Sequence, residues 1–310
     1  MSNERELNAA VSAFMEARCV KTQPEQKAEV PESATGTRKN LLIGIPAFGG
    51  SVDHSTVNML MILSRLLDRE KISHTVLFVA NESLIPRARN YLASVAAFSN
   101  DHAGNDFDSL LFVDADLSFD ARWVIELLKC ELPIVALPYS RKSLNWNFIS
   151  EAAAGHGIAP EHLSGFGGSA NFAIDDDQVF EVGQKPVRVR HAATGAMLVD
   201  VRVFRALTEA FPERRYRPNC NGGSHVPITC EWNFDFFRVG VRKEIYLSED
   251  FAFCEDALEL GFGTYLLPSA RTFHQGAMSY EMDLSKVSAV AAAIERKQAT
   301  TTQSAGDQNG

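Results

Sequence analysis

The chain has 310 residues, of which 45% are hydrophobic and 22% charged, a globular mixture sufficient for one large domain or two small ones. Its 30 basic and 39 acidic residues leave a formal net charge of −9, which argues against a general nucleic-acid binder. The five cysteines are irregularly spaced with no Cys-x-x-Cys, which argues against a structural zinc site and suits a reducing compartment.

The two ends of the chain differ in composition from its middle. Residues 4–18 predict a short amphipathic helix, and the polar stretch from there to residue 39 contains two prolines and is typical of a linker. Residues 288–310 have the composition of a disordered tail. The sequence shows neither the apolar core of a signal peptide nor a run long enough for a membrane span. We therefore expect a soluble, cytoplasmic protein with one folded domain at residues 40–287.

Within that domain, apolar strands alternate with amphipathic helices. The first half predicts strands at 40–48, 74–80, 109–113 and 133–138, with helices at 54–69, at 84–98 and after Asp120. In the second half, the pattern predicts loops and short pieces at 150–186, a strand then a helix at 191–207, and a helix, a stop at Gly261 and a strand at 248–268. Such a pattern predicts an α/β fold with a Rossmann-type, mainly parallel sheet flanked by helices, beside a smaller irregular region.

Asp114 and Asp116 follow the buried run Leu110–Val113 directly. Ligands of parallel sheets bind beyond the carboxyl ends of the strands. Because strand alternation puts residues i and i+2 on one side, the two carboxylates can converge on Mg²⁺ or Mn²⁺. The competing interpretation is turn chemistry, since Asp often begins a loop after a strand. The apolar run ahead of the pair favours the metal site.

Two further stretches contain candidate binding residues. His274 in "TFHQG" follows a strand and can supply a third metal ligand, or it can be a hydrogen-bonded loop residue. In "ESLIPRARN", Arg87 and Asn90 share one helix face and suit a diphosphate or a base edge, while Arg89 points elsewhere. The alternative for that helix is an ordinary solvated face.

The second half of the chain adds a candidate base and candidate sugar contacts. In "SED", Glu249 or Asp250 can act as a general base, or both can serve only the helix N-terminus. Gly195 can let a backbone approach a sugar closely, or it can mark a bulge. Trp146 and Trp232 stand among polar residues, where aromatic faces stack on sugars or bases, although core packing is an equal alternative.

In this order, the stretches "GIPAF", "NESLIPRARN", "DAD", "TGAMLV", "SED" and "HQG" resemble a nucleotide-sugar glycosyltransferase of the GT-A type, over residues 40–280. The Pro-Arg-x-Arg-Asn stretch with "FVDADLSF" is also similar to the fungal Golgi α-mannosyltransferases. The resemblance implies a GT-A-like fold and transfer of a hexosyl or pentosyl group from a UDP- or GDP-sugar. The acceptor hydroxyl would belong to a glycan, a protein or a modified nucleobase, and we expect residues 150–186 to select it.

The resemblance also assigns roles to the acidic residues and the histidine. It implies that Asp116, Asp114 and His274 bind Mn²⁺ or Mg²⁺, with Asp114 contacting either the metal or the ribose. It implies that Asp250, or its neighbour Glu249, is the base of an inverting enzyme. In a retaining enzyme these acids position groups instead, and the sequence leaves both outcomes open.

The expected donor site draws on several segments. The resemblance implies that Pro46–Phe48 hold the nucleobase and ribose together with Asn81 and Arg87. The full expected donor-binding set is Pro46, Ala47, Phe48, Asn81, Arg87, Asn90, Asp114 and Gly195.

A haloacid-dehalogenase-like phosphatase is the main alternative, because "FVDADLS" also fits its signature. Asp114 would then be the nucleophile, Asp116 the acid/base and Ser118 the hydroxyl residue. Two predicted strands precede this motif, and no Gly-Asp-Gly-x-x-Asp motif follows, which disfavours the phosphatase. A non-catalytic nucleotide- or glycan-binding module on the same fold is the second alternative.

Overall fold

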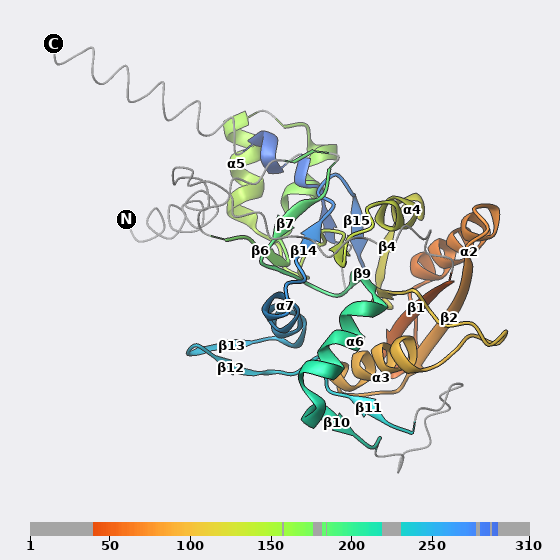
Figure 1. The fold of residues 1–310 in the computed structure, drawn as a ribbon. Coiled ribbons are helices and arrows are strands. Elements are labelled where there is room, and N and C mark those ends of the chain that lie inside the picture. Colours follow the sequence, from red (N-terminus) through yellow and green to blue (C-terminus); the bar gives the residue numbers. More distant parts are fainter. Residues whose placement is uncertain are drawn as a thin grey trace.

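The computed structural model describes residues 40–156, 158–175, 182–183, 185–218, 231–276, 280–285 and 287–290, with a seven-stranded sheet at the centre (Figure 1). In order across the sheet, the strands are β2 (Ser73–Ala80), β1 (Asn40–Ala47), β3 (Ser109–Val113), β9 (Ala196–Asp200), β5 (Ile134–Ala136), β14 (Thr264–Leu266) and β7 (Val187–Val189). Only β9 and β7 run antiparallel to the others. The expected α/β class with a mainly parallel sheet is confirmed.

Helices cover both faces of this sheet, and the central strands are buried on both. Along β3, Leu110 and Phe112 belong to one hydrophobic core, while Leu111 and Val113 belong to the other. The first core includes residues of α3 (Ile85–Phe98), α6 (Val201–Ala210) and α7 (Glu249–Glu259), and the second includes residues of α2 (His54–Arg69) and α4 (Arg122–Lys129). Figure 1 shows α2 and α4 on one side and α3 and α6 on the other. Burial on both faces explains why these strands read as continuous apolar runs.

Polar residues just before the helices set where they begin. Asp53 is the N-cap of α2, and its carboxylate accepts the backbone N–H of Ser55 at 2.8 Å. Asp120 accepts the backbone N–H of Arg122 at 3.0 Å at the start of α4, although the N-cap position itself is Ala121. These bonds satisfy N–H groups that have no partner inside the helix.

Four smaller sheets surround the main one in the described part of the chain. They are β4 (Leu117–Phe119) with β15 (Thr272–His274) and β16 (Tyr280–Met282), β6 (Phe172–Ala173) with β8 (His191–Ala192), β10 (Arg215–Tyr216) with β11 (Asn233–Phe234), and β12 (Gly240–Arg242) with β13 (Ile245–Leu247). Short 3₁₀ helices lie at Phe48–Gly50, Pro160–Phe166 and Pro212–Arg214. In the first of these sheets, β15 pairs with β4 and so places a late segment of the chain beside the residues that follow β3.

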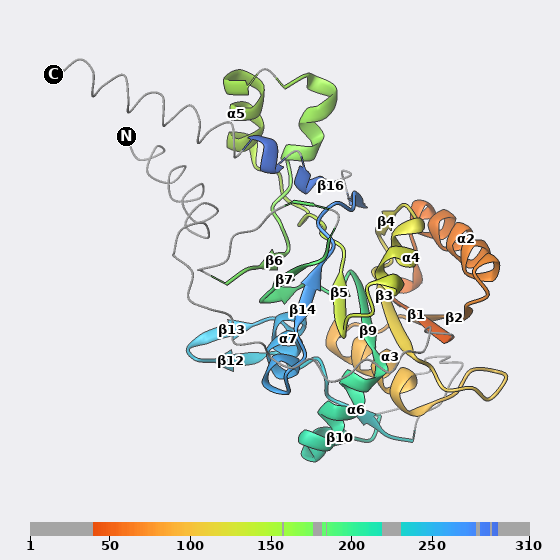
Figure 2. The same ribbon diagram turned by 45° about the horizontal axis from the view of Figure 1, so that its top comes forward.

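The irregular region is more regular than its sequence predicts. Helix α5 (Trp146–His156) occupies the start of the segment expected to be loops, and its Ala152 packs with Phe166 and Val290. Figure 2 shows this region standing apart from the main sheet. Val290 is buried, and the domain bounds at residues 40 and 287 stay a prediction. The predicted helix at 4–18, the linker up to residue 39, and the tail from 291 lie outside the described residues.

Candidate functional site

A pocket of about 580 Å³ lies at the carboxyl ends of β1 and β3. Residues from five separate segments line it, among them Pro46, Phe48, Arg89, Asp114, Asp116, Lys142 and His274. The edge formed by strand carboxyl ends is where open α/β sheets bind ligands. The fold therefore brings both members of the acid pair and the late histidine to one cavity.

The antiparallel pairing of β15 with β4 places His274 beside the acid pair. His274 stands opposite Leu117, which follows Asp116 directly. The Nε2 atom of His274 lies 3.2 Å from Oδ1 of Asp116. The backbone N–H of Gln275 donates to the Asp116 carbonyl oxygen at 2.7 Å. Backbone hydrogen bonds on both sides of His274 therefore fix its distance from Asp116.

The imidazole of His274 is held in one orientation. Its Nδ1 lies 2.8 Å from the carbonyl oxygen of Ser140, and because a carbonyl only accepts, Nδ1 carries the hydrogen and donates it. The ring also meets Tyr139 edge-on, with centroids 5.3 Å apart. Nε2 is therefore the atom that faces Asp116, and it offers a lone pair to a cation or a second proton to the carboxylate.

The other oxygen of Asp116 contacts a lysine. The ammonium group of Lys142, in the loop between β5 and α5, forms an ion pair with Oδ2 of Asp116. Burial acts to raise the pKa of Asp116, but hydrogen bonds from His274 and Lys142 outweigh it and hold the pKa below its usual value. Asp116 is therefore an anion at neutral pH.

Asp116 and His274 fit a divalent cation as two adjacent ligands. In octahedral coordination with metal–ligand distances of about 2.1 Å, adjacent donor atoms are about 3.0 Å apart, close to the 3.2 Å between Oδ1 and Nε2. Among the described residues, no group of three or more His, Cys, Asp or Glu side chains is placed to hold a metal. A cation here would take its remaining ligands from water and from substrate phosphate oxygens.

Asp114 is bound by an arginine. The Nη2 atom of Arg89 lies 3.2 Å from Oδ1 of Asp114, and its Nη1 forms an ion pair with Glu249. The Arg89 side chain is only 5% exposed, and it lines the pocket. The expectation that Arg89 points elsewhere is wrong, because α3 is buried continuously from residue 88 to 97 instead of exposing one face.

This arginine changes what can be expected of the acid pair. One carboxylate oxygen of Asp114 accepts a hydrogen bond from Arg89. The structure places His274 beside Asp116. The role of Asp114 as a metal ligand stays a prediction. Burial acts to lower the pKa of Arg89, and the charges of Asp114 and Glu249 outweigh it and raise that pKa. Its Nε atom is buried without a hydrogen-bond partner. Arg89 is therefore a fixed cation that holds the orientation of Asp114.

The two candidate bases begin α7, next to the pocket but not in its wall. Ser248 occupies the N-cap position and donates its hydroxyl hydrogen to Asp250, which also accepts the backbone N–H of Phe251 at 2.9 Å. Glu249 is connected to the pocket through Arg89. Burial raises the pKa of Glu249, and the charge of Arg89 offsets this only in part.

Of the residues expected to hold the nucleobase, some line the pocket and others lie behind its wall. Pro46 and Phe48 line the pocket, and the Phe48 side chain is 73% exposed. Ala47 is buried, and its carbonyl oxygen accepts the backbone N–H of Asn81 at 3.2 Å. Ala47 and Asn81 therefore hold the ends of β1 and β2 together and do not form the pocket wall.

The two residues selected from the helix face are placed away from the pocket wall. Arg87 is half-exposed and pairs with Glu82, with Nε 2.6 Å from Oε2. Asn90 is buried, and its amide donates to Asp235 at 2.8 Å and accepts the backbone N–H of Phe237 at 2.7 Å. Both ends of the Asn90 amide thus anchor the segment after β11 to α3.

Gly195 allows a close approach to its backbone, but the group that approaches is the ring of Tyr139 and not a sugar. A Cβ atom at this position would lie 2.6 Å from Cζ of Tyr139, and the Gly195 N–H donates to the Tyr139 hydroxyl at 3.2 Å. The Gly195 carbonyl oxygen accepts the backbone N–H of Asp114 at 2.9 Å. Gly195 therefore supports Asp114 and Tyr139 from beneath the pocket.

The two tryptophans lie in different surroundings. Trp146 begins α5 and is 66% exposed. Trp232 is contacted by Arg215 and Arg217, whose guanidinium carbons lie 4.1 and 4.6 Å from its ring centroid. It also lines a separate pocket of about 430 Å³. Trp232 therefore belongs to a cation–π cluster outside the candidate site.

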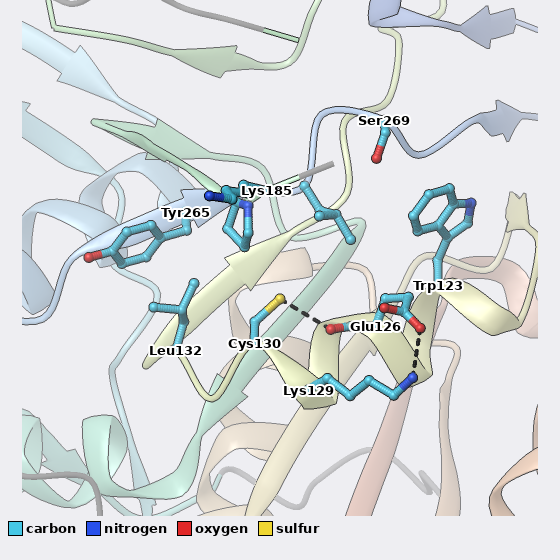
Figure 3. A pocket seen from close by; sticks show the side chains of 10 residues that line it. Trp123, Glu126, Lys129, Cys130, Leu132, Lys185, Tyr265 and Ser269 are labelled. Atoms are coloured by element: carbon cyan, nitrogen blue, oxygen red, sulfur yellow. Dashed lines mark hydrogen bonds and ion pairs between the residues drawn. The ribbon is translucent and has the colours of Figure 1, made fainter. Parts of the chain in front are cut away.

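A further pocket of about 710 Å³ lies between α4 and β14 (Figure 3). Trp123, Cys130 and Tyr265 line it, and Lys129 pairs with Glu126 at 2.9 Å at its rim. None of the residues predicted for the site lines this pocket, so it is not the candidate site.

No family model matches the sequence, and no curated protein matches it. Among solved structures, GalNAc-T7 with UDP, GalNAc and Mn²⁺ is similar at 10% identity and a TM-score of 0.38, covering 88% of this chain and 53% of that chain. A Bacillus anthracis protein described as a glucose-1-phosphate thymidylyltransferase, in complex with sucrose, is similar at 12% identity and a TM-score of 0.32, covering 82% and 94%. This chain thus spans about half the length of the GalNAc-T7 chain.

No helix in the described ranges is both long enough and apolar enough to cross a lipid bilayer.

Proposed function

We propose that this protein is a metal-dependent glycosyltransferase that moves a hexosyl or pentosyl group from a nucleoside-diphosphate sugar to an acceptor hydroxyl. The observation that supports this most directly is the 3.2 Å approach of His274 Nε2 to Asp116 Oδ1 in a pocket beyond the strand ends. A carboxylate and an imidazole at adjacent-ligand distance suit Mn²⁺ or Mg²⁺ that also takes phosphate oxygens.

In this proposal the charged residues of the pocket have different roles. Asp116 and His274 would hold the cation, which when bound supplies Lewis-acid stabilisation of the leaving diphosphate. Arg89 holds Asp114, whose backbone N–H is fixed by Gly195, so that the carboxylate faces the donor in one direction. Pre-set orientation of this kind lowers the barrier, because the group need not reorganise during the reaction.

The donor and the acceptor would approach from different segments. Pro46 and Phe48 would contact the nucleobase and ribose of a UDP- or GDP-sugar, supported by Ala47 and Asn81. The exposed ring of Phe48 offers an aromatic face for stacking. The acceptor hydroxyl would belong to a glycan, a protein or a modified nucleobase.

The acids of α7 would act on the acceptor. If the enzyme inverts, Asp250 or Glu249 removes the proton of the attacking hydroxyl, and in a retaining enzyme they position groups. A base works best when its pKa lies near the working pH. The raised pKa of Glu249 moves it in that direction, while Asp250 is held in place by Ser248.

A thermal-shift panel tests the proposal. UDP-, GDP-, CMP- and dTDP-sugars would be added to the full chain with and without Mn²⁺. We expect one nucleoside diphosphate to raise Tm only when Mn²⁺ is present, and Asp116→Ala to abolish the increase. Asp68→Ala is the matched control, because Asp68 lies on the exposed surface of α2. A metal-dependent increase that persists in Asp116→Ala would refute the site.

The two rival functions give different results in simple assays. A haloacid-dehalogenase-like phosphatase would hydrolyse a generic aryl phosphate without any sugar nucleotide, with Asp114 as nucleophile. We expect no such hydrolysis, because Arg89 engages the Asp114 carboxylate. A non-catalytic binding module would show the thermal shift but no metal-dependent hydrolysis of the sugar nucleotide.

A further inference from the structure

Lys142 reaches the candidate metal carboxylate from a loop that is held in place on both sides. The backbone N–H of Arg141 donates to Ser169 at 2.9 Å, and that of Asn145 donates to Gly167 at 2.8 Å. The carbonyl oxygen of Ser140, in the same segment, accepts from His274. This loop therefore both orients the histidine and delivers the lysine.

The two oxygens of Asp116 face two different partners. Oδ1 faces Nε2 of His274, and Oδ2 contacts the ammonium group of Lys142. A divalent cation on Asp116 would draw on the same negative charge as the lysine and would repel it. Lysine is a compact charge on a flexible stem, and its side chain here is 37% exposed. Its ammonium group can therefore turn away from Asp116 while the backbone stays in place.

The charged residues of the pocket wall indicate which partner the ammonium group of Lys142 can take when it leaves Asp116. The wall contains the acids Asp53, Asp114 and Asp116 and the bases Arg89 and Lys142. Asp116 is already paired with Lys142, so a dication arriving alone must compete with the ammonium group for the charge of this carboxylate. A nucleoside diphosphate brings negative oxygens, which accept hydrogen bonds from an ammonium group.

We propose that Lys142 couples cation binding to nucleotide binding, by pairing with Asp116 in the free protein and with the diphosphate of the bound donor. This inference rests on the proposed function, since it concerns the same cation and the same donor. The cation alone competes with Lys142 for Asp116 and binds weakly. The cation with a nucleoside diphosphate binds tightly, because the diphosphate takes Lys142. Coupling is reciprocal, so the cation strengthens nucleotide binding by the same factor.

Mn²⁺ titration followed by the EPR signal of the free ion tests this without turnover. The full chain is titrated alone and with UDP or GDP, as wild type, Lys142→Met, Lys142→Arg, Asp116→Ala and Lys129→Met. Methionine keeps much of the stem length and removes the charge. Lys129 is the matched control, because it also pairs with a carboxylate, that of Glu126, but at the other pocket (Figure 3).

We expect Lys142→Met to bind Mn²⁺ alone about two- to fivefold more tightly than wild type, the range for losing a partly exposed ion pair. We also expect UDP or GDP to tighten Mn²⁺ binding less in Lys142→Met than in wild type, while Lys142→Arg and Lys129→Met keep the coupling. If Lys142→Met binds Mn²⁺ with the same affinity as wild type and shows the same tightening by UDP or GDP, the inference is overturned. The proposed function still stands in that case, provided that Asp116→Ala abolishes Mn²⁺ binding. If Mn²⁺ binding is insensitive to Asp116→Ala, the proposed function and the inference both fail.

Discussion

Nε2 of His274 lies 3.2 Å from Oδ1 of Asp116, although the two residues are far apart in the sequence. The register of β15 against β4 sets this approach, and the bond from Nδ1 to the Ser140 carbonyl oxygen turns Nε2 inward. A carbonyl that fixes the far nitrogen of a histidine is a common feature of metal sites. The relationship therefore predicts a cation ligand and not a plain loop residue.

His274→Ala should weaken Mn²⁺ binding in the presence of UDP or GDP by at least about 10-fold, the smallest typical loss when only a partner of a ligand is removed, because it removes one of two protein ligands. Isothermal titration calorimetry of the full chain measures this. His162→Ala is the control, since His162 is an exposed histidine of the 3₁₀ helix at Pro160–Phe166. Equal Mn²⁺ affinities in the two variants would show that His274 is not a ligand.

Arg89→Ala should lower the free energy of unfolding by about 3–5 kcal/mol, because it leaves Asp114 and Glu249 without their shared partner in a buried site. Arg87→Ala on the same helix is the control, and its half-exposed pair with Glu82 should be worth no more than about 1 kcal/mol. Urea denaturation measures both values. Similar losses in the two variants would contradict the assignment of Arg89 as a buried structural cation.

A second substitution separates charge from packing at Arg89. Adding Asp114→Asn to Arg89→Ala should recover part of the lost stability, because it removes one uncompensated negative charge. Strict additivity of the two changes would indicate that Arg89 stabilises by packing alone.

The stability of the α7 contact with β8 should depend on pH through Glu255. Burial acts to raise the pKa of Glu255, but hydrogen bonds from His191 and Arg190 outweigh it and hold the pKa below its usual value. Folding therefore favours the ionised form. Its stabilising contribution is present above the unfolded carboxyl pKa and is lost as the pH falls through the lower folded-state pKa.

Glu255→Gln should therefore destabilise the protein at pH 7 by about 1 kcal/mol, and the difference from wild type should shrink as the pH falls below 4. Denaturant melts across this range measure the effect. Glu259→Gln, at an exposed position of the same helix, should show a much smaller change. A difference that stays constant with pH would mean that ionisation of Glu255 does not contribute.

The sequence identified the acid pair because a buried apolar run ends in charged residues, a signal that is local and needs no partner. The alternation of strands and helices can also be predicted from local sequence, because strands that are covered on both faces form continuous apolar runs. His274 is a candidate from the sequence because it follows a predicted strand and because imidazole suits Mn²⁺ and related metals. The contact with Asp116 that the structure adds depends on the β4–β15 register, which no local pattern contains.

The positions of Arg89 and Lys142 in the site could not be predicted from local sequence patterns, because they depend on contacts between distant segments. Helix-face reasoning selects Arg87 and Asn90 because it assumes one solvated face, yet α3 is surrounded by the sheet, α6 and β11, so exposure does not follow the helical period. Lys142 reaches the site through a loop fixed by backbone bonds to residues 167 and 169. Helix α5 was missed because its burial depends on Phe166 and Val290.

The most direct measurement of the central claim is the release of nucleoside diphosphate from the sugar nucleotide that stabilises the protein. We predict release that requires Mn²⁺ or Mg²⁺, stops when EDTA is added, and falls at least about 100-fold in Asp116→Ala, a loss of about 2.7 kcal/mol of transition-state stabilisation, while Asp68→Ala behaves as wild type. Release that continues at the same rate in EDTA, or in Asp116→Ala, would contradict the account.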